Sequence, residues 1–272
     1  IRGRASLFPA PAWIEIFTTS NPSTNDDTVP TSLSISQGNL QFAVGWSGKD
    51  DANVGVVRTY IYGGTPGAFS VKGADDIATI AGVDYARGTA VALADDPDIL
   101  YMGIPSLASS GTPGNGQVYH YAYTAAWAYV DPEMNYDPPA LNANYGTSIA
   151  LSDYDTGTAR WYTTHGAPGA PTPYGGAMYV ATLVSTGAWY ANIGAQANAV
   201  LTGPVGSEFG HSSAISNYLP ASKTIRAVAG APGATDSDAS LFRVVKGVSG
   251  TSWVWTTLFE VKVAVGALGT SV

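Results

Sequence analysis

The stretch TTHGAPGAPTPYGGAMYVATLVSTGAWY, from Thr163 to Tyr190, sets a Gly-Ala-Pro-Gly turn before a strand-like run and ends on Ala-Trp. The stretch VAGAPGATDSDASLFRVVKGVSGTSWVW, which begins at Val228, keeps the same order with few of the same residues. Self-similarity at a spacing of about 50 residues is typical of propellers and other repeat arrays. This repeat is therefore the main indication of the fold.

The same order occurs five times along the chain. Each unit carries a glycine followed by a strand-like run, and the run is followed by a small residue and an aromatic one. The glycines are Gly45, Gly103, Gly166, Gly230 and Gly266. The small-aromatic pairs are Ala68-Phe69, Ala126-Trp127, Ala188-Trp189, Ser252-Trp253 and, at the front of the chain, Ala12-Trp13. We expect the glycines to permit tight turns and the aromatic residues to fill the space between neighbouring units.

A further strand precedes the glycine in four units, in GTAVALA from Gly88, YGTSIALS from Tyr145, FGHSSAIS from Phe209 and, more weakly, PTSLSIS from Pro30. Four short strands separated by turn residues make one propeller blade. The sequence predicts an all-β, closed β-propeller of five blades, each with about four antiparallel strands. One domain would span residues 1–272, with blade units at 30–71, 86–130, 145–190 and 209–256, and a fifth formed by 261–272 joined with 1–17.

The fifth unit is short. Only 13 residues separate Trp253 from Gly266, whereas the other units use 32 to 41 residues between the same landmarks. At about 3.3 Å per residue such a segment cannot supply the loops and strands of a full unit. We expect that about 20 residues are absent from this stretch, the alternative being a fifth blade without an inner strand, and that the two termini share one blade.

The composition restricts the function. Charged residues make up 12% of the chain, and 12 basic against 20 acidic side chains give a net charge of −8, which would repel nucleic acid. The absence of cysteine excludes disulfides, thiolate catalysis and cysteine-bound zinc. No apolar run is long enough to span a bilayer. The sequence therefore favours a soluble all-β protein without a nucleic-acid partner.

The phrase that joins FGHSSAIS to VAGAPG resembles the FG-GAP repeat of the integrin α-subunit propeller. The third and fourth units match best, with Tyr145-Gly146 or Phe209-Gly210 followed by a Gly-Ala-Pro-Gly turn. Integrin propellers have seven blades, whereas five units are counted here. The resemblance implies a propeller of a secreted or surface-displayed protein.

Calcium is the cofactor that the sequence suggests. Asp153, Asp155 and Gly157 form a D-x-D-x-G pattern after the first strand of the third unit, and such alternation lets oxygen ligands converge on a hard cation. The resemblance places calcium loops at this point of a blade. Asp95 and Asp98 occupy the same place in the second unit. An Asx turn is the alternative explanation of the pattern.

No residue stands out as catalytic. His120 alternates with tyrosines in VYHYAY, so we expect a packed strand histidine, and His211 lacks a recognisable catalytic partner. An enzyme is thus the less favoured reading. The low-charge loops, rich in Ser, Thr, Gly and Asn, suit carbohydrate or protein ligands.

The sequence favours a non-catalytic adhesion or recognition module of a secreted or cell-surface protein, lectin-like if its ligand is carbohydrate. Two alternatives remain. The first alternative is a structural propeller module associated with other chains of an extracellular assembly. The second is a propeller-scaffold hydrolase or lyase whose site lies on the axis.

Overall fold

The computed structural model describes residues 2–4, 13–15, 30–36, 40–46, 55–64, 68–73, 89–94, 99–105, 116–129, 134–135, 143–157, 160–170, 175–184, 199–232, 240–248 and 254–263. These residues form antiparallel β-sheets and contain no helix, which confirms the all-β prediction. Within this part of the chain there is accordingly no helix that could cross a membrane.

Four sheets follow one another along the chain, each with strands paired in chain order. The first holds β3 (Ser32–Ser36), β4 (Gln41–Trp46), β5 (Val56–Tyr62) and β6 (Phe69–Val71). The second holds β7 (Ala90–Ala94), β8 (Ile99–Ile104), β9 (Gln117–Tyr123) and β10 (Trp127–Tyr129), with β11 (Met134–Asn135) also paired to β9. The third holds β12 (Ser148–Leu151), β13 (Arg160–Ala167), β14 (Ala177–Val184) and β15 (Ala199–Thr202). The fourth holds β16 (Ser212–Ile215), β17 (Thr224–Ala231), β18 (Ser240–Val248) and β19 (Val254–Val263).

The four sheets repeat in register. The glycine of each unit pairs with the first residue of that unit's inner strand, as Gly45 with Ser32, Gly103 with Ala90, Gly166 with Ser148 and Gly230 with Ser212. The same glycine-to-first-residue pairing thus occurs in all four sheets, as expected of a structural repeat. Four of the sequence units therefore contribute to four successive antiparallel sheets.

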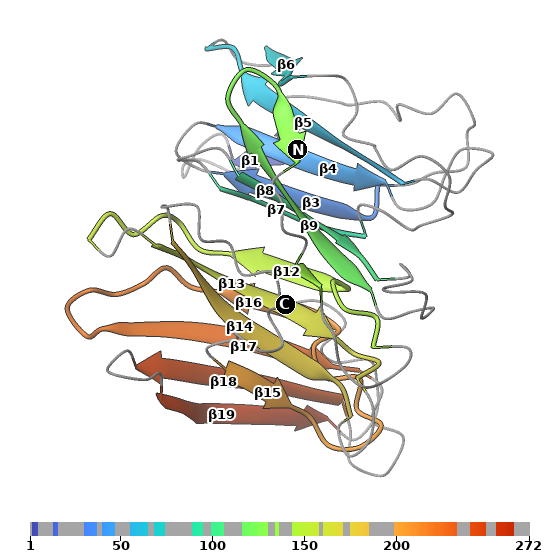
Figure 1. Cartoon of the computed structure of the whole chain (residues 1–272), viewed down its shortest axis with the longest axis vertical. Helices are drawn as coiled ribbons and strands as arrows, with labels where there is room; N and C mark the ends of the chain where they lie inside the picture. The colour runs from blue at the N-terminus through green and yellow to red at the C-terminus, as the bar shows by residue number, and fades with distance from the viewer. Residues whose placement is uncertain are drawn as a thin grey trace.

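The first strands of the sheets lie side by side. Strand β3 contacts β7, β7 contacts β12, and β12 contacts β16. Figure 1 shows the sheets following one another through the molecule, with the first two in its upper half and the last two in its lower half. Consecutive four-stranded meanders whose first strands adjoin are the arrangement of β-propeller blades.

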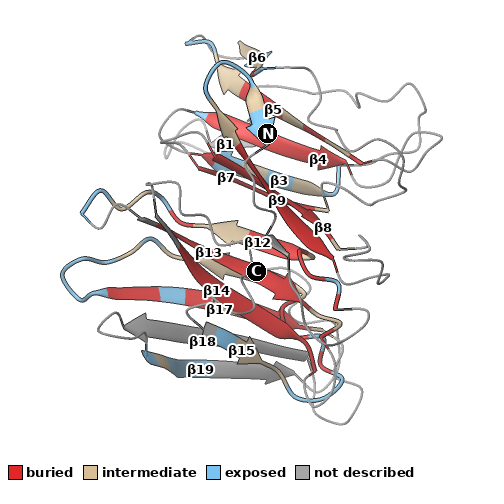
Figure 2. Ribbon diagram, viewed as in Figure 1, coloured by how far each residue is buried: buried red, intermediate tan, exposed pale blue. Residues whose placement is uncertain are grey.

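The cores lie between neighbouring sheets, where Figure 2 shows the buried strands. One cluster joins the first and second sheets through Ala43, Val57 and Tyr119, among others. A larger one joins the second and third sheets, and another joins the third and fourth. Trp127 packs against the first of these clusters, and its Nε1 donates to Thr59 Oγ1 of the neighbouring sheet at 2.7 Å. The expected role of this tryptophan between blades is confirmed.

The repeated glycines serve a different purpose from the one expected. Gly103 and Gly166 lie inside the second strands, not in turns. A Cβ at Gly103 would lie 2.0 Å from the carbonyl oxygen of Gly146, so a side chain there would collide with the next sheet. Gly146 itself has a φ of 88°, which favours glycine. The repeat thus encodes a close backbone approach between neighbouring blades.

Two unit boundaries differ from the prediction. The third sheet ends with β15, beyond residue 190, and β19 of the fourth sheet continues to Val263, so that Val261–Val263 pair with β18. The position and length of an outer strand depend on its backbone pairing with the neighbouring strand. The aromatic residue used to predict the end of a unit carries no information about that pairing. One ten-residue strand thus occupies most of the stretch from Trp253 to Gly266.

The front of the chain forms a hairpin of β1 (Arg2–Arg4) and β2 (Trp13–Glu15). Residues 264–272 lie outside the described residues, as do Trp189 and Trp253. Five blades, ring closure and a blade shared by the termini therefore stay predictions.

Candidate functional site

Two cavities adjoin at the end of the molecule where the inner strands begin. The first has a volume of about 290 Å³ and is called here the strand-start cavity. It is lined by Asn144, Thr147, Pro168, Gly169, Glu208 and His211. The second, of about 210 Å³, lies between the first residues of the inner strands and shares Thr147 and His211 with it. His211 is therefore placed where the two cavities meet.

The turn before β16 holds Glu208 and His211 in place. Phe209, between them in sequence, is fully buried, and its backbone N–H donates to the carbonyl oxygen of Gly175 in the preceding blade at 2.7 Å. The His211 N–H donates to the Glu208 carbonyl oxygen at 3.1 Å and closes the turn. Glu208 has a φ of 54°, an uncommon conformation for a residue other than glycine. A carboxylate and an imidazole are thus presented from one anchored turn.

The imidazole of His211 differs from its counterpart in the preceding unit. Thr147 occupies the equivalent position before β12, and its Oγ1 donates to the Asn144 carbonyl oxygen at 2.7 Å. The Nδ1 of His211 is buried and has no hydrogen-bond partner among the described residues. A buried ring nitrogen without a partner is costly in a purely structural role. Alignment of the repeated units is the sequence signal that singles out His211. The residue directly before the inner strand is threonine in the second and third units and histidine in the fourth.

The other two histidines are structural. His120 is 1% exposed and stacks on Tyr101 with ring centroids 5.0 Å apart, as expected for a packed strand histidine. His165 is fully buried, with Tyr145 Oη bonded to its Nδ1 and Thr163 Oγ1 bonded to its Nε2 at 2.8 Å. Burial lowers the pKa of each imidazole to about 3. Both rings are therefore neutral at physiological pH.

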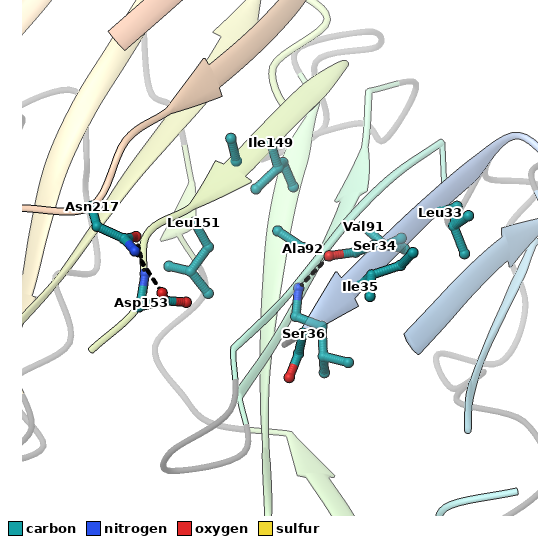
Figure 3. Close-up of a pocket in the computed structure, with 12 residues that line it drawn as sticks. Leu33, Ser34, Ile35, Ser36, Val91, Ala92, Ile149, Leu151, Asp153 and Asn217 are labelled. Atoms are coloured by element: carbon teal, nitrogen blue, oxygen red, sulfur yellow. Dashed lines mark hydrogen bonds between the residues drawn. The ribbon is translucent and has the colours of Figure 1, made fainter. Parts of the chain in front are cut away.

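A third cavity, of about 330 Å³, lies where the inner strands end and is called here the strand-end cavity. Its lining comprises Leu33, Ser34, Ile35, Ser36, Val91, Ala92, Leu93, Ile149, Ala150, Leu151, Asp153 and Asn217. Figure 3 shows Asp153 and Asn217 on one side of the space and Ser34, Ile35 and Ser36 on the other. The cavity is thus built by consecutive blades, with a carboxylate and an amide on one rim.

The two aspartates of the predicted calcium loop have different hydrogen-bond partners. Asp153 pairs with Asn217 of the next blade, whose Nδ2 donates to Asp153 Oδ2 at 2.6 Å. Asp155 Oδ1 accepts from the Gly157 N–H at 3.1 Å, which is the Asx-turn arrangement. The described residues contain no cluster of three or more His, Cys, Asp or Glu side chains suited to a metal ion. Asp95 and Asp98 lie outside the described residues, and calcium binding stays a prediction.

No protein-family model matches the chain, and no curated protein matches it in sequence. The FG-GAP resemblance is therefore not supported by these comparisons.

Solved structures with a similar fold are found at low sequence identity. One is a mutant of AofleA from Arthrobotrys oligospora, with 10% identity, a TM-score of 0.46, and coverage of 86% of this chain and 60% of that one. Another is an endo-arabinanase from Bacillus licheniformis, with 11% identity, a TM-score of 0.41, and coverage of 84% and 73%. An α-L-arabinanase from Cellvibrio cellulosa has 13% identity, a TM-score of 0.42, and coverage of 83% and 76%. The chain thus spans less than two thirds of the length of the first of these structures.

The comparison corrects the expected function. Most of the matched structures named in it are carbohydrate-active enzymes, among them arabinanases, a xylosidase and a deacetylase. The prediction of a non-catalytic adhesion or recognition module is wrong on this finding, which agrees better with the alternative of a propeller-scaffold hydrolase. Since every TM-score quoted is below 0.5, the residues that carry any activity must be identified from this chain itself.

Proposed function

We propose that the chain is a propeller-scaffold hydrolase or lyase that acts on a carbohydrate at the strand-start cavity. The observation that carries the proposal is the placement of His211 and Glu208 in one cavity, on one anchored turn, with the Nδ1 of His211 unpartnered among the described residues. Imidazoles and carboxylates are the side chains that most often transfer protons in catalysis.

The surroundings of His211 suit a neutral, hydroxyl-rich substrate. The adjoining cavity is lined by hydroxyl side chains, namely those of Ser32, Thr89, Thr147, Ser148, Ser212 and Ser213. No Lys or Arg occurs among the described lining residues of either cavity, so an anionic substrate would find no counter-charge there. A polyhydroxylated substrate can exchange hydrogen bonds with hydroxyls and with the Asn144 amide.

The number of carboxylates limits the chemistry. Hydrolysis of a glycosidic bond by the common route uses two carboxylates about 5 to 10 Å apart. Glu208 is the one carboxylate among the described residues that line the two cavities. This favours base-assisted reactions of neutral substrates. His211 would remove a proton either from water that attacks a substituent ester or amide, or from the sugar carbon next to an esterified carboxyl group, with departure of the glycosidic oxygen from the adjoining carbon. Glu208 would stabilise the imidazolium that forms.

A panel of neutral, acetylated and methyl-esterified uronic-acid polysaccharides tests the proposal, with release of reducing ends, acetate and unsaturated product as the readouts. On a substrate that is turned over, we expect His211→Ala to lower kcat/KM by about 10²- to 10⁴-fold, the usual contribution of a general base. Glu208→Gln should lower it less, because it acts through the imidazole.

Arg226→Gln is the matched control, since this exposed side chain lies on β17 outside both cavities. It should leave kcat/KM unchanged. No turnover by the wild-type chain in any of the three readouts, or equal activity of the wild type and His211→Ala, would contradict the proposal.

The secreted or cell-surface location and the FG-GAP relationship belong to the same proposal. An extracellular polysaccharide would require a secreted enzyme. The absence of cysteine is compatible with a location inside or outside the cell. Fractionation of the native source with an antibody to this chain would test the location.

A further inference from the structure

We infer that the strand-end cavity binds a small organic cation, a primary alkylammonium group with its alkyl chain in the cavity and its nitrogen at Asp153. This site is distinct from the strand-start cavity, and the inference does not depend on the proposed function.

The lining combines one charge with an aliphatic wall. Asp153 is the only charged residue among the described lining residues, and no Lys or Arg accompanies it. The wall is formed by Leu33, Ile35, Val91, Leu93, Ile149 and Leu151, together with two alanines. An alkyl chain gains free energy on leaving water for such a surface, and a carboxylate at its rim selects a positive end group.

The carboxylate of Asp153 is oriented before any ligand binds. The Oδ2 of Asp153 accepts a hydrogen bond from Asn217 Nδ2 at 2.6 Å, and the backbone N–H of Asp153 donates to Asn217 Oδ1 at 2.9 Å. This two-point pairing fixes the carboxylate between the third and fourth blades, as Figure 3 shows. Oδ1 receives no hydrogen bond from the described residues, and the side chain is exposed. Oδ1 is therefore available to a donor that enters from solvent.

Ser36 supplies the second, independent indication of a ligand. It is 5% exposed and lines the cavity, yet its Oγ is buried without a hydrogen-bond partner among the described residues. The neighbouring Ser34 differs, because its Oγ accepts from the Leu93 N–H at 2.9 Å. A buried hydroxyl without a partner costs free energy that a ligand would recover.

Other ligand classes fit less well. An anion would meet a carboxylate and, among the described lining residues, no positive charge. A sugar ring would meet no aromatic side chain, since none lines the cavity within the described part of the chain. A hard metal ion would need several oxygen ligands, but the described lining residues include one carboxylate. The volume of about 330 Å³ lies at the lower end of ligand sites, which suits a cation of a few carbon atoms.

Calorimetric titration of the whole chain with n-alkylammonium ions from ethyl to hexyl tests the inference. We expect saturable binding of butylammonium, in the millimolar range or tighter, that strengthens with chain length until the cavity is full. 1-Butanol has the same alkyl chain without the charge and should bind at least tenfold more weakly.

Asp153→Asn keeps a side-chain acceptor for Asn217 and removes the charge, so it should weaken butylammonium binding at least tenfold. Ser36→Ala should weaken it about threefold or more. Asp155→Asn removes an equal charge two residues away, outside the cavity lining, and should change the affinity less than threefold.

The inference is overturned if no alkylammonium ion binds, if 1-butanol binds as tightly as butylammonium, or if Asp153→Asn and Asp155→Asn weaken binding equally. Competition by Ca²⁺ that depends on both aspartates would assign the site to a metal ion instead. Thermal melts of each variant, matched to the wild type, ensure that lost binding reflects the site and not unfolding.

Discussion

A Cβ atom on Gly166 would lie 1.8 Å from the carbonyl oxygen of Gly210 in the next blade. Gly210 has a φ of 90° and stands one residue after Phe209, whose ring is buried between the third and fourth blades. Ser148 Oγ donates to the same carbonyl oxygen at 2.9 Å. Gly103 and Gly146 make the same approach one blade earlier. The two halves of the repeated phrase therefore meet across each of these blade interfaces.

Gly166→Ala should destabilise the fold because the obstructing atom is backbone and cannot move without separating the blades. We expect the free energy of unfolding to fall by about 3 kcal/mol or more, at the upper end of overpacking effects. Urea unfolding measures it. Gly157→Ala is the control, since its Cβ would meet only Asp155 Oδ1 at 3.4 Å, and a loss below about 1 kcal/mol is expected there. Equal losses in both variants would argue against the close approach.

Trp127→Phe should weaken the interface between the first and second blades. The Trp127 Nε1 donates to Thr59 Oγ1 and to the Lys72 carbonyl oxygen, at 2.7 and 3.1 Å. Phenylalanine keeps most of the apolar contact and removes both hydrogen bonds, for an expected loss of about 1 to 3 kcal/mol. Chemical denaturation of wild type, Trp127→Phe, Thr59→Val and the double variant gives the coupling. Additive losses in the double variant would show that the two side chains do not interact.

Acid should destabilise the chain through its buried histidines. Burial lowers the pKa of His120 and His165 to about 3, whereas an unfolded histidine titrates near 6.5. Between these values the unfolded chain binds protons that the folded chain does not bind. The free energy of unfolding should therefore be fully retained above about pH 6.5 and decrease as the pH falls toward 3, by up to about 1.4 kcal/mol per pH unit for each histidine.

Urea unfolding at several pH values between 7 and 4 measures this slope. His120→Phe keeps a ring to stack on Tyr101 and removes one titrating group, so its slope should be smaller than that of the wild type. Identical slopes would contradict the assignment of His120 as a neutral, buried group.

Calcium at Asp153 and Asp155 remains to be tested. If the ion binds there, a chelator should lower the melting temperature and excess Ca²⁺ should restore it, because a ligand that binds only the folded state stabilises that state. Asp155→Ala should abolish the response. A melt that is unchanged by chelator and by both Asp→Ala variants would leave Asp155 with its Asx turn alone.

Much of the strand order could be predicted from the sequence, because its signals are local. A short apolar run flanked by turn residues specifies a strand, as in SLSIS of β3 and SIAL of β12, and four such runs in order specify an antiparallel sheet. The glycines and the aromatic landmarks recur in the chain itself, so the structural unit could be recognised four times over. His120 could be placed in the core for the same reason, from its alternation with tyrosines along one strand.

The reason why the glycines recur, and the choice of polar groups that meet, follow from the way the blades stack. Gly166 and Gly210 are 44 residues apart, and Asp153 and Asn217 are 64 apart, so no local pattern pairs them. Stacking the blades brings each inner strand beside the next, which sets His211 and Glu208 at one end of these strands and Asp153 with Ser36 at the other. The strands and their repeat can be read from the local sequence, because they depend on neighbouring residues. The strand-start and strand-end cavities depend on contacts between blades, and these contacts exist only once the chain has folded.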